Sequence, residues 1–190
     1  MNEDRLMRWQ VGADVAIAGF TFVLLAVSGF QGYLLKQSVD LARNTSEKQL
    51  RAYVVCAGGE MTDARKPNTS LTITAKNTGQ TPARDVQMIT QFTVRDPDWD
   101  GPFEFSLEPA SMSVLGPGME LENSKTFDVP PEMIKLLEEG KKVIWIWGTV
   151  RYTDVFGVDR YTNFRFLEGG ANGFHVGTAL TFSTKGNDAN

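Results

Sequence analysis

VAIAGFTFVLLAVSGFQGYLL, residues 15–35, runs for twenty-one residues without a formal charge, between Asp14 and Lys36. A helix rises about 1.5 Å per residue, so about twenty apolar residues cross a hydrocarbon core of ~30 Å. Trp9 and Tyr33 lie near the two ends of the run, where amphipathic rings favour the headgroup region. The stretch therefore predicts a transmembrane helix, which divides the chain into an anchor and the domain that follows it.

A cleavable signal peptide is the alternative interpretation of this region. Arg5 and Arg8 supply a basic N-terminal part, and Ala26-Val27-Ser28 is similar to a small-residue cleavage site. The apolar run continues past that point to Leu35, which makes it longer than a typical signal core. The length therefore favours a retained anchor, with residues 1–14 as an N-terminal tail.

The charges that flank the run leave its orientation open. Arg5 and Arg8 precede it, and Lys36, Arg43 and Lys48 follow it. The count of Lys and Arg favours a cytoplasmic C-terminal domain, whereas the short basic tail and the signal-like layout favour export of that domain. We expect a single-pass protein of the inner (cytoplasmic) membrane with its C-terminal domain in the periplasm.

Composition excludes some partners and some kinds of site. A net charge of −4 and a pI near 5.1 give no long-range attraction for nucleic acid. Cys56 is the only cysteine, which excludes an internal disulfide and a zinc site built from thiolates.

Small residues in and just before the apolar run would let two anchor helices associate as a homo-oligomer. Gly12 and Ala16, like Ser28 and Gly32, have the spacing of small residues at helix–helix contacts.

The sequence pattern changes from helical to β beyond the anchor. Residues 36–50 are expected to continue as a helical stalk, because a thin apolar stripe repeats along them. From residue 51 the chain is rich in β-branched and aromatic residues, and residues 70–77 alternate between apolar and polar side chains. The expected strands are residues 51–57, 70–77, 85–95, 103–107, 111–115, 124–129, 142–152, 160–166 and 174–183.

One helix is expected inside this domain, over residues 131–139, because Pro130-Pro131 opens it and Gly140 stops it. Many short strands, separated by Gly- and Pro-containing turns, predict a mainly β fold with little helix. We expect an immunoglobulin-like β-sandwich over residues 51–190, with the last few residues disordered.

Three stretches beyond the anchor carry a resemblance: Tyr53-Val54, Asn77-Thr-Gly-Gln-Thr-Pro-Ala-Arg-Asp-Val86, and Gly148-Thr-Val-Arg-Tyr-Thr-Asp-Val-Phe-Gly157 with Thr162-Asn-Phe164. They resemble a group of uncharacterised proteobacterial single-pass membrane proteins with an N-terminal anchor helix and a β-rich, immunoglobulin-like domain. The resemblance covers nearly the whole chain, and it implies a fold and a membrane location but no activity. Relatives often carry His near position 160 and Cys near position 165, where this chain has Arg160 and Arg165. This departure removes the case for a shared metal or redox site.

Residues 154–157 are expected to connect two strands of a hairpin. Gly157 can adopt a positive φ there, and the Asp154 carboxylate can accept hydrogen bonds from nearby backbone amides. Tyr152 and Phe156 would then be packing anchors. Turn chemistry accounts for this motif without a catalytic role.

Asp96-Pro-Asp-Trp-Asp-Gly101 matches the first half of a calcium-binding loop, with carboxylates at alternate positions and Gly at the sixth. The bidentate carboxylate of such a loop would fall at Leu107, and Glu108 comes one position late. An acidic surface turn is the alternative interpretation. The candidate calcium ligands are Asp96, Asp98 and Asp100.

Trp145 and Trp147 share one face of a predicted strand, while Ile144 and Ile146 share the other face. One face must be core. The other is either an exposed apolar stripe that binds a partner, or a surface that the helix at residues 131–139 covers. The two indoles are therefore candidate interaction residues.

No arrangement of residues in the sequence predicts catalysis. His175 is the only histidine, and Cys56 falls in a predicted strand, where a buried thiol is inert. The sequence contains no phosphate-binding Gly-rich motif and no nucleophile elbow, so no cofactor is expected.

We therefore expect a non-enzymatic, membrane-anchored β-sandwich interaction module, as an accessory protein or complex subunit of the envelope. Its expected partners are the lipid bilayer, through residues 15–35, and a membrane or envelope protein. The alternative is a ligand- or calcium-binding sensor domain tethered to the membrane, with the loop at residues 96–100 as its site.

Overall fold

The computed structural model describes residues 3–105, 112–170, 174 and 179–190. The chain forms two compact units, Met1–Lys48 and Gln49–Asn190, and each is described separately. His175, Leu107 and Glu108 lie outside the described residues.

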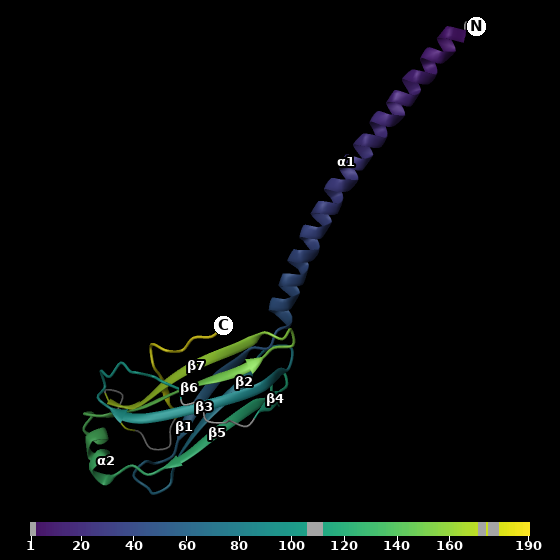
Figure 1. Cartoon of the computed structure of the whole chain (residues 1–190). Helices are drawn as coiled ribbons and strands as arrows, with labels where there is room; N and C mark the ends of the chain where they lie inside the picture. The colour runs from purple at the N-terminus through teal and green to yellow at the C-terminus, as the bar shows by residue number, and fades with distance from the viewer. Residues whose placement is uncertain (1–2, 106–111, 171–173, 175–178) are drawn as a thin grey trace. The chain divides into compact units, whose positions relative to one another are not determined.

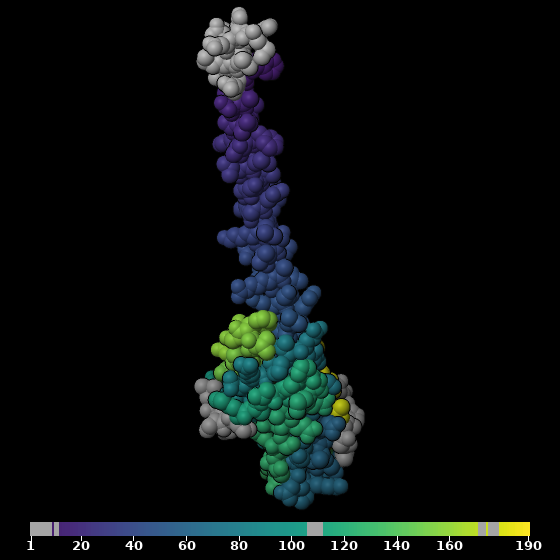
Figure 2. Space-filling view, turned by 90° about the vertical axis from the view of Figure 1, so that its right-hand side faces the viewer, coloured from purple at the N-terminus to yellow at the C-terminus, as the bar shows by residue number. Residues whose placement is uncertain are grey.

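α1 (Glu3–Leu50) is one continuous helix. It includes the predicted anchor and stalk, and it begins within the predicted tail, because residues 3–14 contain no Pro and are mostly good helix formers. The described side chains of its apolar run are exposed (Figure 2), and its most apolar window has a mean hydropathy of 1.9. α1 is therefore long and apolar enough to cross a membrane, a property that N-terminal signal sequences share.

Two antiparallel sheets make up the β-rich unit (Figure 1). The order of strands is β1-β2-β5 in the three-stranded sheet and β4-β3-β6-β7-β8 in the five-stranded sheet. The short helix α2 (Pro131–Glu138) lies between β5 and β6 in the chain and has Pro in its first turn, as expected. The strands are β1 (Val54–Met61), β2 (Thr69–Asn77), β3 (Ala83–Arg95), β4 (Ser113–Leu115), β5 (Glu120–Phe127), β6 (Val143–Thr153), β7 (Asp159–Gly169) and β8 (Thr181–Phe182).

One hydrophobic core contains side chains from both sheets. The alternation predicted for residues 70–77 is confirmed, because β2 buries every second side chain. Gly148 lets β6 pack closely, since a Cβ atom there would lie 2.1 Å from the Ile89 carbonyl oxygen and 2.3 Å from the Phe164 ring. The largest fully buried side chains include Leu71, Ile73, Ile144, Ile146, Phe164 and Phe166.

Several of the predicted strands differ from the structure. β5 begins at Glu120 and ends at Phe127, where a strand was expected at residues 124–129. Of the strand expected at residues 174–183, the described part contains only β8, Thr181–Phe182. β1 continues through Gly58 and Gly59 to Met61, where an end was expected at residue 57. A β-bulge between Cys56 and Gly58 takes up the irregularity, and the missing side chain of Gly59 leaves room for Ile73. The strand expected at residues 103–107 is wrong for its described part, residues 103–105, which form no strand and cover a sheet instead.

The buried side chain of Asn77 joins three segments of the β-rich unit. Its Oδ1 accepts hydrogen bonds from the backbone N–H groups of Tyr53 and Gly79, at 3.3 and 3.0 Å. Its Nδ2 donates to the carbonyl oxygens of Thr81 and Leu115, at 2.8 and 2.9 Å. Asn77 is fully buried, so these bonds replace the water that its amide loses.

The predicted hairpin between β6 and β7 is confirmed. Asp154 Oδ1 accepts hydrogen bonds from the N–H groups of Phe156 and Val158, at 2.9 and 3.0 Å, and Gly157 has φ +77°. The other carboxylate oxygen accepts a bond of 3.0 Å from Nε of Arg160. Tyr152 is buried, as expected, but Phe156 is exposed and is not a packing anchor.

The last residues, expected to be disordered, lie along the free edge of β7. Asn163 N–H donates to the Asp188 carbonyl, and Asn190 N–H donates to the Tyr161 carbonyl. Backbone and Asn side-chain hydrogen bonds with β7 hold these residues in place, contrary to the expectation of disorder.

Candidate functional site

The outer face of the five-stranded sheet is the face that points away from the shared core. The antiparallel register aligns Gln87 of β3 with Arg151 of β6 and Tyr161 of β7 across this face. One row further along, Thr149 stands beside Asn163. Trp147 and Arg165 follow in the same direction. One half of this face is therefore aromatic and the other half is polar.

A segment of residues 96–105 closes the aromatic half. Trp99, Phe103 and Phe105, which we call the aromatic cap, pack on Trp145 and Trp147. Ring centroids of Trp99 lie 5.7 Å from Trp145 and 5.9 Å from Trp147, distances typical of aromatic pairs. The two indole N–H groups donate to backbone carbonyls of the same segment, at Asp96 and Glu104.

The prediction of an exposed indole stripe is wrong. Trp145 is 6% exposed and Trp147 is 8% exposed. The alternative, cover by the helix at residues 131–139, is also wrong, because the aromatic cap covers the indoles and Leu137 of α2 belongs to the other core cluster. Local periodicity identified the two faces of the strand correctly, but it carries no information on which distant segment covers them.

Arg165 lies against the aromatic cap. Its guanidinium carbon lies 3.3 Å from the centroid of the Phe103 ring, in cation–π geometry. Burial lowers the pKa of Arg165 below its usual value, and the charge of Asp100 opposes this shift. The Asp100 carboxylate therefore interacts electrostatically with the Arg165 guanidinium in this structure.

The predicted calcium ligands do not assemble into a metal site. Asp96 accepts a hydrogen bond of 2.8 Å from Nζ of Lys142, so its carboxylate forms an ion pair with this lysine. Within the described part of the chain, no three His, Cys, Asp or Glu side chains converge as metal ligands. The loop that carries Asp98 and Asp100 holds the aromatic cap, and the acidic-turn interpretation describes it better than the calcium interpretation.

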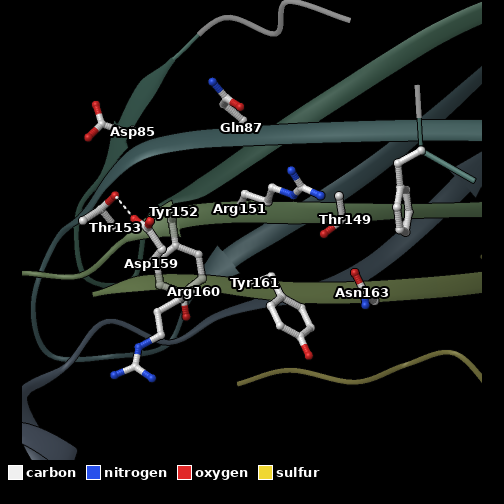
Figure 3. Close-up of a pocket in the computed structure, with 11 residues that line it drawn as sticks. Asp85, Gln87, Thr149, Arg151, Tyr152, Thr153, Asp159, Arg160, Tyr161 and Asn163 are labelled. Atoms are coloured by element: carbon white, nitrogen blue, oxygen red, sulfur yellow. Dashed lines mark hydrogen bonds between the residues drawn. The ribbon is translucent and has the colours of Figure 1, made fainter. Parts of the chain in front are cut away.

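The polar half of the outer face is an open hollow of about 550 Å³. Figure 3 shows its side chains on adjacent strands, with Arg151 between Gln87 and Tyr161. A β-bulge between Arg84 and Gln87 shapes one rim, and Asp85 in this bulge has φ +51°. The lining residues are Asp85, Gln87, Phe105, Thr149, Arg151, Tyr152, Thr153, Asp159, Arg160, Tyr161 and Asn163.

Arg151 is exposed in the middle of the hollow, and its guanidinium has no hydrogen-bond or ion-pair partner among the residues that the structure describes. The neighbouring charges are different: Arg160 is paired with Asp154, and Asp159 accepts a 3.0 Å bond from the Thr153 hydroxyl. This site was not predicted from the sequence. Its signal was the alternation of polar Thr149, Arg151 and Thr153 with apolar neighbours on β6.

Cys56 is not part of the hollow. It lies in β1, and burial raises the pKa of its thiol to about 12. The thiol is therefore protonated at physiological pH and matches the inert cysteine expected from the sequence.

Residues 9–168 match a family model whose description is Domain of unknown function (DUF8453). The match includes the apolar run of α1 and all strands from β1 to β6, and it ends inside β7. The segment at residues 180–190, which covers the edge of β7, lies outside the matched range. No curated protein and no solved structure matches the chain.

Proposed function

The chain belongs to the DUF8453 family, and we propose that it is a membrane-anchored, non-enzymatic binding protein. Residues 15–35 would span the inner membrane, and the two sheets would form an immunoglobulin-like sandwich that binds a membrane or envelope protein. An anchor confines such a domain to the plane of the membrane, which raises its effective concentration for a partner held there.

The unpartnered Arg151 in the hollow supports a binding role more than any other feature. A guanidinium makes bidentate hydrogen bonds with a carboxylate, and Arg is enriched among the residues that contribute most to protein interfaces. Tyr161 and Phe105 add aromatic surface to the same hollow.

The charges of the hollow fit a protein partner. Arg151 and Asp85 are both exposed on its lining and carry opposite charges. The phosphates of a nucleic acid would be repelled by the Asp85 carboxylate. A protein surface can supply both a carboxylate for Arg151 and a cation for Asp85. The calcium-binding form of the sensor alternative has no support, because Asp96, Asp98 and Asp100 do not converge.

The proposed orientation predicts the result of protease protection. We expect protease added to intact spheroplasts to remove a C-terminal tag and to digest the β-rich unit, because an exported domain is accessible from outside. A cytoplasmic marker protein in the same sample must stay intact until lysis. Protection of the tag until lysis would instead place the domain at the cytoplasmic face.

Arg151→Glu is expected to abolish cross-linking from the hollow. With a photo-reactive amino acid at Gln87, the wild-type background should give an adduct of one defined mass in native membranes. Arg151→Glu should reduce this adduct at least tenfold, because the substituted carboxylate repels the carboxylate that we assign to the partner.

Arg95→Glu is the matched control, because Arg95 is exposed on β3 and does not line the hollow. The control should leave the adduct unchanged. Equal loss in both variants, or an adduct that survives in Arg151→Glu, would contradict a role for the hollow.

A further inference from the structure

The edge of β7 that faces away from β6 is covered by the chain itself. In an antiparallel sheet, alternate residues of a strand direct their N–H and C=O groups toward opposite sides, and those of Tyr161, Asn163 and Arg165 point to this edge. Their partners are residues 183–190: Ser183 N–H donates to Arg165, and Asn163 N–H donates to the Asp188 carbonyl. The edge therefore already receives an extended segment of polypeptide.

This segment is an irregular substitute for a strand. β8 has only two residues, Thr181–Phe182, and regular pairing with β7 stops there. Beyond it, two side-chain amides replace backbone carbonyls: Asn190 Oδ1 accepts from Tyr161 N–H at 2.9 Å, and Asn187 Oδ1 accepts from Arg165 N–H at 2.8 Å. A continuous strand could make the same bonds with its own backbone.

Residues 184–190 are held by little besides these bonds. Every one of them is exposed, whereas Leu180 is buried. The half-exposed ring of Phe182 packs at a tilt on the buried ring of Phe166, with ring centroids 4.4 Å apart. Segments with few buried apolar contacts and solvent-exposed hydrogen bonds open at low energetic cost. The attachment at Leu180 and Phe182 is therefore firm, and the cover beyond it is easily displaced.

A recess of about 170 Å³ lies beneath the segment and is lined by Val55, Cys56, Phe164 and Phe182, among others. Asn187, Asp188 and Ala189 of the segment also line the recess, and Ala189 forms a bridge with Thr162. Its methyl group is the smallest apolar side chain, so the recess has room for a larger one.

We propose that the outward edge of β7 is a binding site for an extended polypeptide segment of a partner, which adds to the sheet as a strand and displaces residues 183–190. The preferred segment carries a large aliphatic side chain in the position of Ala189, where it fills the recess. This edge is distinct from the hollow, and the proposal stands whether or not Arg151 binds a partner.

Hydrogen exchange in the full chain tests whether the cover opens. We expect the amides of Tyr161, Asn163 and Arg165 to exchange at least tenfold faster than those of Thr162 and Phe164, which face β6. Asn187→Ala with Asn190→Ala should accelerate exchange at Tyr161 and Arg165 at least a further tenfold and leave Thr162 and Phe164 unchanged. Equal protection of both sets of amides would overturn the proposal.

A peptide experiment then tests the site itself. A chain that ends at Phe182 should bind a fluorescent peptide of residues 183–190, and the Ala189→Leu form of the peptide at least tenfold more tightly. The full chain should bind the Leu form at least tenfold more weakly than the shortened chain, because its own segment competes. A peptide with Asn187→Ala and Asn190→Ala is the control, and it should bind the shortened chain at least tenfold more weakly than its parent.

Equal binding to the full and the shortened chain would overturn the proposal, because the peptide would then bind at a site other than the edge of β7. No gain from the Leu side chain would overturn the assignment of the recess. If the shortened chain does not fold, the same competition is measured with the full-length double Asn variant, which keeps every residue of the chain and should bind the Leu peptide at least tenfold more tightly than wild type.

Discussion

Asp154→Ala is expected to lower the free energy of unfolding of the β-rich unit by about 4 kcal/mol, within the range for breaking a buried, hydrogen-bonded ion pair. The side chain of Asp154 is fully buried, and the substitution removes the partner of Arg160 and of two turn amides. The Arg160 side chain, only 20% exposed, would lose its carboxylate partner without gaining full access to water. The loss should appear as a lower urea midpoint, followed by tryptophan fluorescence.

Tryptophan fluorescence reports on this unit, because three of the four tryptophans, Trp99, Trp145 and Trp147, lie in or under the aromatic cap. Asp98→Ala is the matched control: Asp98 is exposed, and its loss should change stability by less than about 0.5 kcal/mol. A loss below about 1 kcal/mol in Asp154→Ala would contradict the importance of the buried pair.

Asn77→Ala is expected to have an effect of similar size, about 4 kcal/mol, from four hydrogen bonds at about 1 kcal/mol each. The substitution leaves two backbone N–H groups and two carbonyl oxygens without their side-chain partner. These groups belong to the residue just before β1, the turn before β3 and the end of β4. The three segments would therefore lose the hydrogen bonds that connect them through Asn77. Thermal unfolding of the full chain in detergent, with the same fluorescence readout, measures the loss.

Asn123→Ala provides a matched control for Asn77→Ala. Asn123 lies on β5, and its buried Oδ1 has no hydrogen-bond partner in the described part of the chain. Removal of an unsatisfied buried group should be neutral or stabilising, within about 0.5 kcal/mol. Equal destabilisation by both substitutions would mean that the bonds of Asn77 contribute little.

Local patterns predicted much of the fold. The uncharged run at residues 15–35 predicted a helix, and strict alternation in residues 70–77 predicted β2 and its buried face. The turn residues Asp154 and Gly157 have the roles that their chemistry suggested. These features depend on neighbouring residues, so the sequence pattern contains them.

The candidate site depends on distant contacts, which local patterns do not specify. The cover of Trp145 and Trp147 comes from residues 96–105, a segment whose spacing of carboxylates suggested calcium. The polar hollow results from the register of β3, β6 and β7, which no single strand reveals. Disorder was expected for the last few residues, and only the edge of β7 gives the side-chain amides of Asn187 and Asn190 an ordered role.

The single cysteine has a practical consequence for labelling chemistry. Maleimides react with the thiolate, and burial raises the pKa of the Cys56 thiol to about 12, so very little of it is thiolate at pH 8. A second cysteine placed at an exposed position would thus be modified selectively, without replacement of Cys56. The rate at which Cys56 itself is modified would then report how often β1 opens to solvent.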